Sequence, residues 1–135
     1  MSYITPDNSK ARMSSHDHHA ALLSANSLEG DDIVNRQDEK LGNVKEIMLD
    51  TGSGKVAYVV LSAGGVLGIG DRLFAIPWNA LSLDTANHRF VLDADAERIK
   101  NAPGFDKDHW PDMADQSWVD SVNSYYGASS DVPRR

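Results

Sequence analysis

Residues 41–63, LGNVKEIMLDTGSGKVAYVVLSA, decide the fold of this chain. Aliphatic residues dominate 44–49 and 55–63, and the segment between them, 50–54, contains two glycines. Glycine adopts the positive φ angles that tight hairpin loops require, so we predict two strands joined by a hairpin at 50–54. In the second strand, Val56, Tyr58 and Val60 are expected on one face, with apolar neighbours on the other. A strand that is apolar on both faces is expected inside a sheet, covered on both sides.

Turn signals recur at short intervals on either side of this hairpin. The expected elements are a strand and turn at 28–34, a turn at 38–42, strands at 73–78, 80–83 and 88–93, and a short helix at 95–101. Pro77 lacks a backbone donor and is expected at an edge, an end or a bulge of its strand. Short strands without β-α-β spacing indicate a mainly β fold, a small antiparallel barrel of five or six strands.

Composition divides the chain into three regions. Residues 1–21 are polar with few large apolar side chains, and we predict a disordered tail. Residues 22–93 hold most of the β-branched residues and are expected to form the folded β domain. Residues 94–135 are acidic and aromatic, and we predict a C-terminal extension with one short helix and otherwise mainly irregular structure.

Charge and cysteine content exclude several classes of function. The chain has 20 acidic and 13 basic residues, a formal net charge of −7, and no cysteine. The negative charge disfavours a nucleic-acid partner, and the lack of cysteine excludes disulfides, thiolate metal sites and a cysteine nucleophile. No apolar run approaches the roughly 18 residues of a membrane span, and the first twenty residues lack the apolar core of a signal peptide. We therefore expect a cytoplasmic protein without a membrane span.

Three clusters resemble known sites only superficially. The glycine loop at 65–70 lacks the following helix that a dinucleotide-binding or phosphate-binding loop needs. The histidines within 16–19 lie in the predicted tail, without a scaffold to fix four ligands, so only adventitious metal binding is expected there. The aspartates within 106–115 lack the glycine and the glutamate of a calcium loop. We expect no catalytic, cofactor-binding or metal-binding residues and no enzymatic activity.

Aromatic and loop residues indicate a surface for interaction. Five of the ten aromatic residues fall in the last third of the chain, and the 65–70 loop carries three aliphatic side chains. Either the aromatic residues cover the barrel of their own chain, which we favour slightly, or they anchor a partner, as aromatic residues often do at interfaces. A homodimer would combine the two roles. The candidate interaction surface comprises Val66, Leu67, Ile69, Trp78, Phe105, Trp110, Trp118, Tyr125 and Tyr126.

An ordered set of motifs resembles the PRC-barrel domain. The motifs are Asn35, LG-x-V-x-x-IMLD at 41–50, GKVAYVVL at 54–61 and LFAIPW at 73–78. The resemblance covers roughly residues 23–93, and the downstream NAPGFDK at 101–107 is similar to stand-alone bacterial members of the family. The family is named after the photosynthetic reaction centre H subunit and includes the C-terminal domain of a ribosome maturation factor. Its members imply a small β barrel without enzymatic activity that serves as an adaptor for protein partners.

Two departures limit what the resemblance implies. The chain shows neither the transmembrane helix of the H subunit nor the N-terminal domain of the ribosome factor, so electron transfer and ribosome assembly are not carried over. The leading hypothesis is a non-enzymatic protein-interaction or assembly module that forms a homodimer and binds an unidentified protein. The alternative is a small-ligand or metal-responsive binding protein that uses the barrel mouth, the glycine loop or the histidines.

Overall fold

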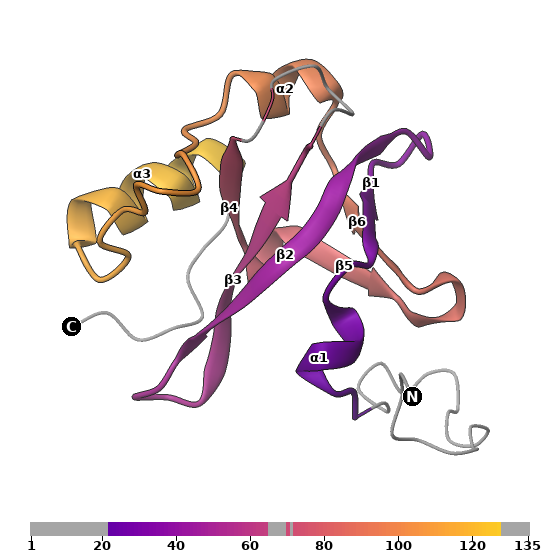
Figure 1. Cartoon of the computed structure of the whole chain (residues 1–135), viewed down its shortest axis with the longest axis horizontal. Helices are drawn as coiled ribbons and strands as arrows, with labels where there is room; N and C mark the ends of the chain where they lie inside the picture. Colours follow the sequence, from indigo (N-terminus) through magenta and orange to yellow (C-terminus); the bar gives the residue numbers. More distant parts are fainter. Residues whose placement is uncertain (1–21, 65–69, 71, 128–135) are drawn as a thin grey trace.

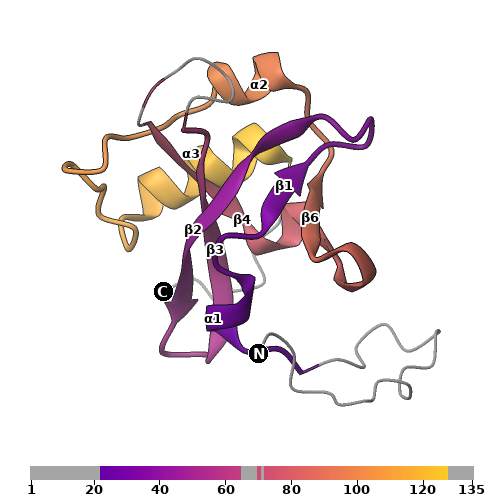
Figure 2. The ribbon, with the colours of Figure 1, turned by 45° about the vertical axis from the view of Figure 1, so that its right-hand side comes forward.

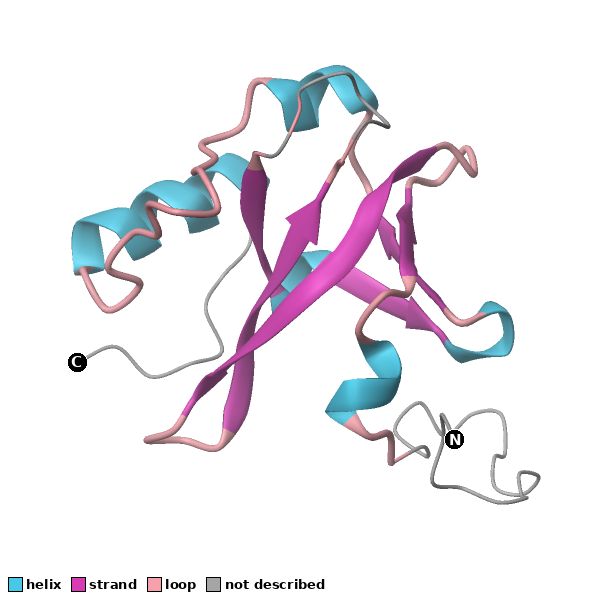
Figure 3. Ribbon diagram, in the orientation of Figure 1, coloured by secondary structure: helices cyan, strands magenta, loops and turns pink. Residues whose placement is uncertain are grey.

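The computed structural model describes residues 22–64, 70 and 72–127. It contains one six-stranded sheet with the strand order β4-β3-β2-β1-β6-β5, flanked by short helices (Figures 1 and 3). The elements are α1 Ala25–Leu28, β1 Asp32–Val34, β2 Lys40–Asp50, β3 Lys55–Ser62, β4 Leu73–Pro77, η1 Trp78–Ala80, β5 Leu81–Asp84, η2 Thr85–Asn87, β6 Arg89–Leu92, α2 Ala96–Lys100 and α3 Gln116–Tyr126. The predicted tail at 1–21 and the loop residues Val66, Leu67 and Ile69 lie outside the described residues.

The β2–β3 hairpin forms as predicted and is the longest antiparallel pair of the sheet. Its loop closes through a 2.8 Å hydrogen bond from the Gly54 amide to the Asp50 carbonyl, and Gly54 has a φ of +78°. That conformation suits glycine, which has no Cβ to clash with the backbone. The hairpin therefore fixes the register of the two strands that form the centre of the molecule.

The turn before β2 lies three residues earlier than predicted, and β2 begins at Lys40. Asn35 is buried, and its side-chain oxygen accepts hydrogen bonds from the amides of Gln37 and Glu39, at 3.0 and 2.9 Å. Its side-chain nitrogen donates to the Glu39 carboxylate at 2.8 Å, so every polar atom of this side chain has a partner. An asparagine that bonds the following backbone in this way makes a turn without glycine.

The mainly β class is confirmed, with two differences from an antiparallel barrel. β1 pairs with β6 in parallel, whereas the other four strand pairs are antiparallel. Among the described strands, β4 and β5 form two separate edges, so the twisted sheet is not closed into a barrel (Figure 2). Pro77 ends the edge strand β4, as predicted, a position at which a residue without a backbone donor is tolerated.

The two faces of β3 contribute to two separate apolar clusters, as its sequence predicts. Val59 and Leu61 belong to the larger cluster, whereas Tyr58 and Val60 belong to the smaller one. The prediction is wrong for Val56. Met48 pairs with Tyr58 and Leu49 with Val56, so Ala57 is an extra residue that forms a β-bulge. The bulge reverses the alternation and places Val56 beside Ile47 and Leu49, on the face of the larger cluster.

The C-terminal region is more regular than predicted. α2 occupies the expected position, and the Asp95 side chain caps its first turn by accepting a bond from the Arg98 amide. The prediction of mainly irregular structure after α2 misses one element, because Gln116–Tyr126 form the helix α3. Asp115 caps its start, and Gly127 ends it with a φ of +66°. This helix packs against the β3–β4 side of the sheet (Figures 1 and 2).

Candidate functional site

One face of the β3–β4 region is covered by the chain's own C-terminal residues. Trp118 meets the ring of Tyr58 edge-on, with centroids 5.2 Å apart, and Val122 is buried in the same cluster. Phe105 is also buried there and pairs with Leu73 through two backbone hydrogen bonds of 2.8 and 2.9 Å. These aromatic residues therefore cover their own sheet, which is the role we favour from the sequence. Whether they also contact a partner stays a prediction.

Trp110 lies at the margin of this covered face, whereas Tyr125 packs against the larger cluster. The ring of Trp110 packs on Phe105 at a centroid distance of 5.0 Å, yet 38% of Trp110 is exposed. Arg98 of α2 lies over the ring of Tyr125, 4.4 Å from its centroid, and donates to the Tyr125 carbonyl. These two contacts of Arg98 join α2 to the C-terminal end of α3.

Two polar atoms on the buried side of α3 have no hydrogen-bond partner, the Asn123 side-chain nitrogen and the Tyr126 hydroxyl. Burial is the main cause that raises the pKa of Tyr126 above its usual value, and the neighbouring Tyr125 adds to the effect. A buried hydroxyl without a partner costs about 1–3 kcal/mol. The packing of α3 on the sheet therefore includes the free-energy cost of desolvating these two groups.

Replacing Tyr126 by phenylalanine is expected to stabilise the protein by about 1 kcal/mol at neutral pH, because it removes the unpartnered hydroxyl and keeps the ring. The raised pKa in the folded state also means that wild-type stability falls as pH rises above the unfolded-state tyrosine value of about 10. The variant should lack this contribution to alkaline destabilisation. Urea unfolding at pH 7 and at pH 10.5 measures both effects. A variant that is less stable at pH 7 would contradict the assignment.

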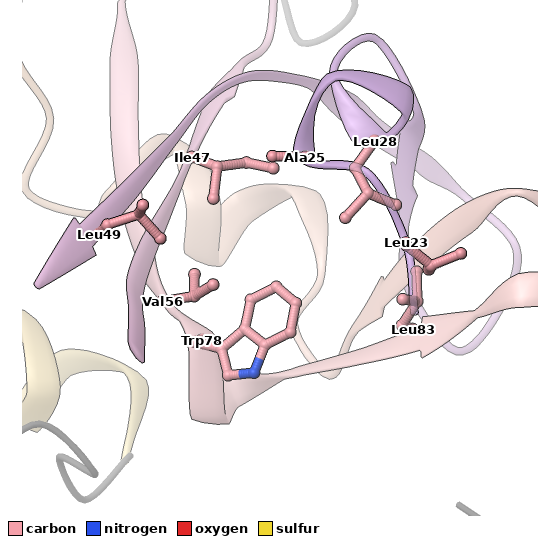
Figure 4. Close-up of a pocket in the computed structure, with 8 residues that line it drawn as sticks. All are labelled: Leu23, Ala25, Leu28, Ile47, Leu49, Val56, Trp78 and Leu83. Carbon is pink, nitrogen blue, oxygen red and sulfur yellow. The ribbon is translucent and has the colours of Figure 1, made fainter. Parts of the chain in front are cut away.

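The opposite face of the sheet is open at one end and forms an apolar groove. The groove has a volume of about 240 Å³ and is lined by Leu23, Ala25, Leu28, Ile47, Leu49, Val56, Trp78 and Leu83. The lining side chains surround one hollow, with those of β2 and β3 facing those of α1 and β5 across it (Figure 4). Hereafter, "the groove" means the surface formed by these eight residues.

Each wall of the groove is held by a different part of the fold. The β-bulge turns Val56 toward Ile47, and both strands of the hairpin thus contribute to one wall. Trp78 follows Pro77 at the end of β4, and its ring rests edge-on against the buried Phe90, with centroids 5.8 Å apart. α1 supplies Ala25 and Leu28. The groove is thus continuous with the larger cluster, whose buried residues form its floor.

The chemistry of the groove is that of apolar contact. None of its eight lining residues carries a carboxylate, imidazole, hydroxyl or ammonium group, and Trp78 contributes the single side-chain nitrogen. Elsewhere in the described part of the chain, no group of three or more histidine, aspartate or glutamate side chains is placed to hold a metal ion. The histidines within 16–19 lie outside that part. The groove can bind an aliphatic or aromatic group, and it offers nothing for acid–base or nucleophilic chemistry.

The Asp31 carboxylate is partly buried and lacks one hydrogen-bond partner. One oxygen of Asp31 has no hydrogen-bond partner, and burial raises the pKa of Asp31, with His88 acting in the opposite direction. Asp31 follows α1, and its carbonyl accepts a 2.9 Å bond from the Val44 amide. The neighbouring Asp32 carboxylate also raises the pKa of Asp31, and we regard Asp31 as part of the α1–β1 connection.

The predicted interaction residues are divided between the two faces. Trp78 lies in the groove. Of the C-terminal aromatics, Tyr125 packs against the larger cluster, and the other four lie on or beside the covered face. Sequence reasoning missed the other seven groove residues, which come from segments distant in the sequence. One signal was available, because the aliphatic residues of β2 continue to Leu49, next to the predicted hairpin loop. In the structure 58% of Leu49 is exposed.

Comparison with known proteins shows the family. The sequence profile of the PRC-barrel domain matches residues 22–99, more than half of the chain. The chain belongs to the PRC-barrel domain family. The matched range contains the whole sheet, most of α2 and all eight residues of the groove, whereas α3 lies outside it. The groove is thus part of the PRC-barrel domain, and α3 is an addition to it.

The wider comparisons add little to the family assignment. No curated protein matches the chain. Solved structures do match, among them one described as a 16S ribosomal RNA processing protein RimM of Pseudomonas aeruginosa. It is 19% identical with a TM-score of 0.42, and the match covers 55% of this chain and 44% of that one. The chain thus matches less than half of that protein's length. In the described residues, no helix has both the length and the apolar character needed to cross a membrane.

Proposed function

We propose that this PRC-barrel protein is a non-catalytic protein-binding module that accepts an apolar side chain of its partner in the groove. The observation that carries the proposal is an open apolar recess on a rigid sheet, with Leu49 largely exposed at its rim. Exposed apolar surface of this kind on a small domain marks an interaction site. A preformed pocket that desolvates one large apolar group is the usual setting of an interface hot spot.

A protein partner is better supported than a small ligand or a nucleic acid. Pockets for specific small molecules combine apolar walls with a few converging polar groups, and the groove has only the indole nitrogen of Trp78. A net charge of −7 opposes approach to a phosphate backbone. The partner is therefore expected to present an aliphatic or aromatic side chain from a folded surface or a peptide. Association with a second copy and association with another protein both fit this chemistry.

A peptide-display selection tests the proposal. Random peptides selected on the full-length protein should carry a large apolar residue. Their affinity should fall at least tenfold when Ala25→Phe fills the groove, because loss of one buried anchor costs about 1.4 kcal/mol or more. Asn26→Phe is the matched control. It adds the same ring to the same helix, at a residue that does not line the groove.

One result would overturn the proposal. If the selected peptides bind Ala25→Phe and Asn26→Phe with the affinity of the wild type, the groove is not the binding site. Thermal unfolding of both variants, measured alongside, shows whether each keeps the fold.

A further inference from the structure

The face of the sheet that α3 covers shows which kind of element it accepts. The buried residues on the sheet side of this contact are mostly apolar and come from β3, β4 and the segment after α2: Tyr58, Val60, Leu73, Ala75 and Phe105. Hereafter, "the β3–β4 face" means these five residues. α3 lies against them (Figure 2) with Trp118, Val122 and Tyr126, which recur at every fourth position and so share one side of the helix.

α3 is joined to the rest of the protein as a separate unit. The match to the PRC-barrel domain ends at residue 99, whereas α3 begins at Gln116. Phe105 is held to Leu73 by backbone hydrogen bonds, and the ten residues 106–115 that follow form turns but no helix or strand. Ten residues of extended chain span roughly 33 Å. The length of this connection therefore allows α3 to leave the sheet while Phe105 stays in place.

The contact between α3 and the sheet is imperfect at two polar groups. The side-chain nitrogen of Asn123 and the hydroxyl of Tyr126 are buried without a hydrogen-bond partner. Both groups regain water when α3 leaves the face, so undocking recovers part of the free energy that the lost apolar contacts cost. A helix with apolar side chains at these two positions would cover the same face without this penalty.

The contacts that hold α3 in place are limited. Among the apolar side chains of the helix, Val122 alone is fully buried, whereas Trp118, Tyr125 and Tyr126 are partly exposed. Arg98 of α2 adds a hydrogen bond and a ring contact to Tyr125, but this link lies at the exposed end of the helix. A second helix that buries its apolar side more completely can therefore compete for the face.

We propose that the β3–β4 face is a further binding site, for an amphipathic helix of another protein, and that α3 covers it until such a helix displaces it. The partner helix carries large apolar side chains at every fourth position, as Trp118, Val122 and Tyr126 do, and an apolar residue in place of Asn123. A second copy of this chain does not meet this description, because its α3 carries the same two polar groups. It gains nothing over the helix that is already attached, and attachment gives the latter a high effective concentration.

Binding of a synthetic helix to the full-length protein tests this inference. The probe is a fluorescent peptide with the sequence of residues 112–127, in which Asn123→Leu and Tyr126→Phe remove the two polar groups. Fluorescence anisotropy should show weak binding to the wild type, because the peptide must displace an attached helix. Trp118→Ala in the protein removes the ring contact of α3 with Tyr58 and should raise the affinity by about tenfold.

Matched controls separate this site from others. Ser124→Ala introduces the same alanine on the exposed side of α3 and should leave the affinity at the wild-type value. Ala25→Phe fills the groove and should also leave it unchanged, because the groove lies on the opposite face of the sheet. A probe that carries Val122→Asp in addition should not bind, because its carboxylate would enter an apolar cluster.

Hydrogen exchange of the wild type gives a measurement that does not depend on the folding of any variant. A short helix that has left the sheet is unstable in water, so the Val122 amide should exchange with each undocking event. The Val59 and Leu61 amides at the centre of the sheet need global unfolding. We therefore expect exchange at Val122 to be faster by about tenfold or more.

Three outcomes would overturn the inference. One is exchange of Val122 at the same rate as Val59 and Leu61, which would show that α3 does not leave the sheet. Another is a probe that binds neither the wild type nor Trp118→Ala at several hundred micromolar. The third is a probe that binds both with equal affinity, which would place it elsewhere on the protein. Circular dichroism of each variant, recorded alongside, shows whether it keeps the fold.

Discussion

Gly42→Ala is expected to lower the free energy of unfolding by about 3 kcal/mol, a large fraction of the stability of a small domain. A Cβ at position 42 would lie 2.5 Å from the Ser62 carbonyl oxygen and 2.9 Å from a methyl carbon of Leu61. The carbonyl belongs to the backbone of the neighbouring strand, so it cannot turn away as a flexible side chain would. β2 and β3 must therefore separate locally at the centre of the sheet. Urea unfolding followed by circular dichroism measures the loss.

Gly52→Ala is the control for this substitution. Gly52 lies in the loop of the same hairpin, and a Cβ there would meet only the Asp50 carboxylate, at an ordinary contact distance of 3.6 Å. Its φ is not among the positive values, so alanine fits the backbone and restricts the unfolded chain. We expect a change within about 0.5 kcal/mol. Equal losses for the two variants would show that close packing at Gly42 is not the cause.

Val122→Asp is expected to destabilise the protein by about 4 kcal/mol, because it places a carboxylate without a partner in an apolar cluster. Val122 is 1% exposed and faces the sheet from the middle of α3, in the cluster with Tyr58 and Phe105. The expected result is release of α3 or loss of the whole fold. Urea unfolding and the binding of an apolar dye, which reports exposed core surface, measure it. Ser121→Asp is the control on the exposed side of the same helix.

A negative result for Val122→Asp would also be informative. If both variants unfold like the wild type and neither binds more dye, α3 does not contribute to the stability of the sheet. The domain would then remain folded even when α3 does not cover this face.

The sequence predicts the sheet well because each turn is determined by a few residues that are close together in the sequence. The hairpin glycines, Pro77 at the end of β4 and the turn at 84–87 each act over a few residues, and the strands between them follow. The β-bulge at Ala57 has no such signal, since alanine and its neighbours suit a regular strand equally well. The parallel pairing of β1 with β6 likewise cannot be predicted from local sequence, because it depends on how the whole sheet twists.

The candidate site is harder to predict than the sheet for the same reason. The groove collects residues from 23–28, 47–56 and 78–83, and nothing in any one segment indicates the others. Only Trp78 was among the predicted interaction residues. α3 was missed although Trp118, Val122 and Tyr126 recur at helical spacing, because polar and acidic residues surround them and the segment lacks a long apolar pattern.

The parallel pairing of β1 with β6 has a consequence for how the chain acquires its structure during synthesis. β1 is the first strand to leave the ribosome, yet Asp32, Ile33 and Val34 pair with Arg89, Phe90 and Val91 near the end of the domain. The β2–β3 hairpin can form early, within microseconds of its emergence. β1 must keep one of its edges unsatisfied until β6 has been translated, and such long-range pairing slows folding. The nascent chain therefore exposes an open strand edge from the synthesis of β1 until that of β6, the period in which a chaperone or a neighbouring nascent copy would meet it.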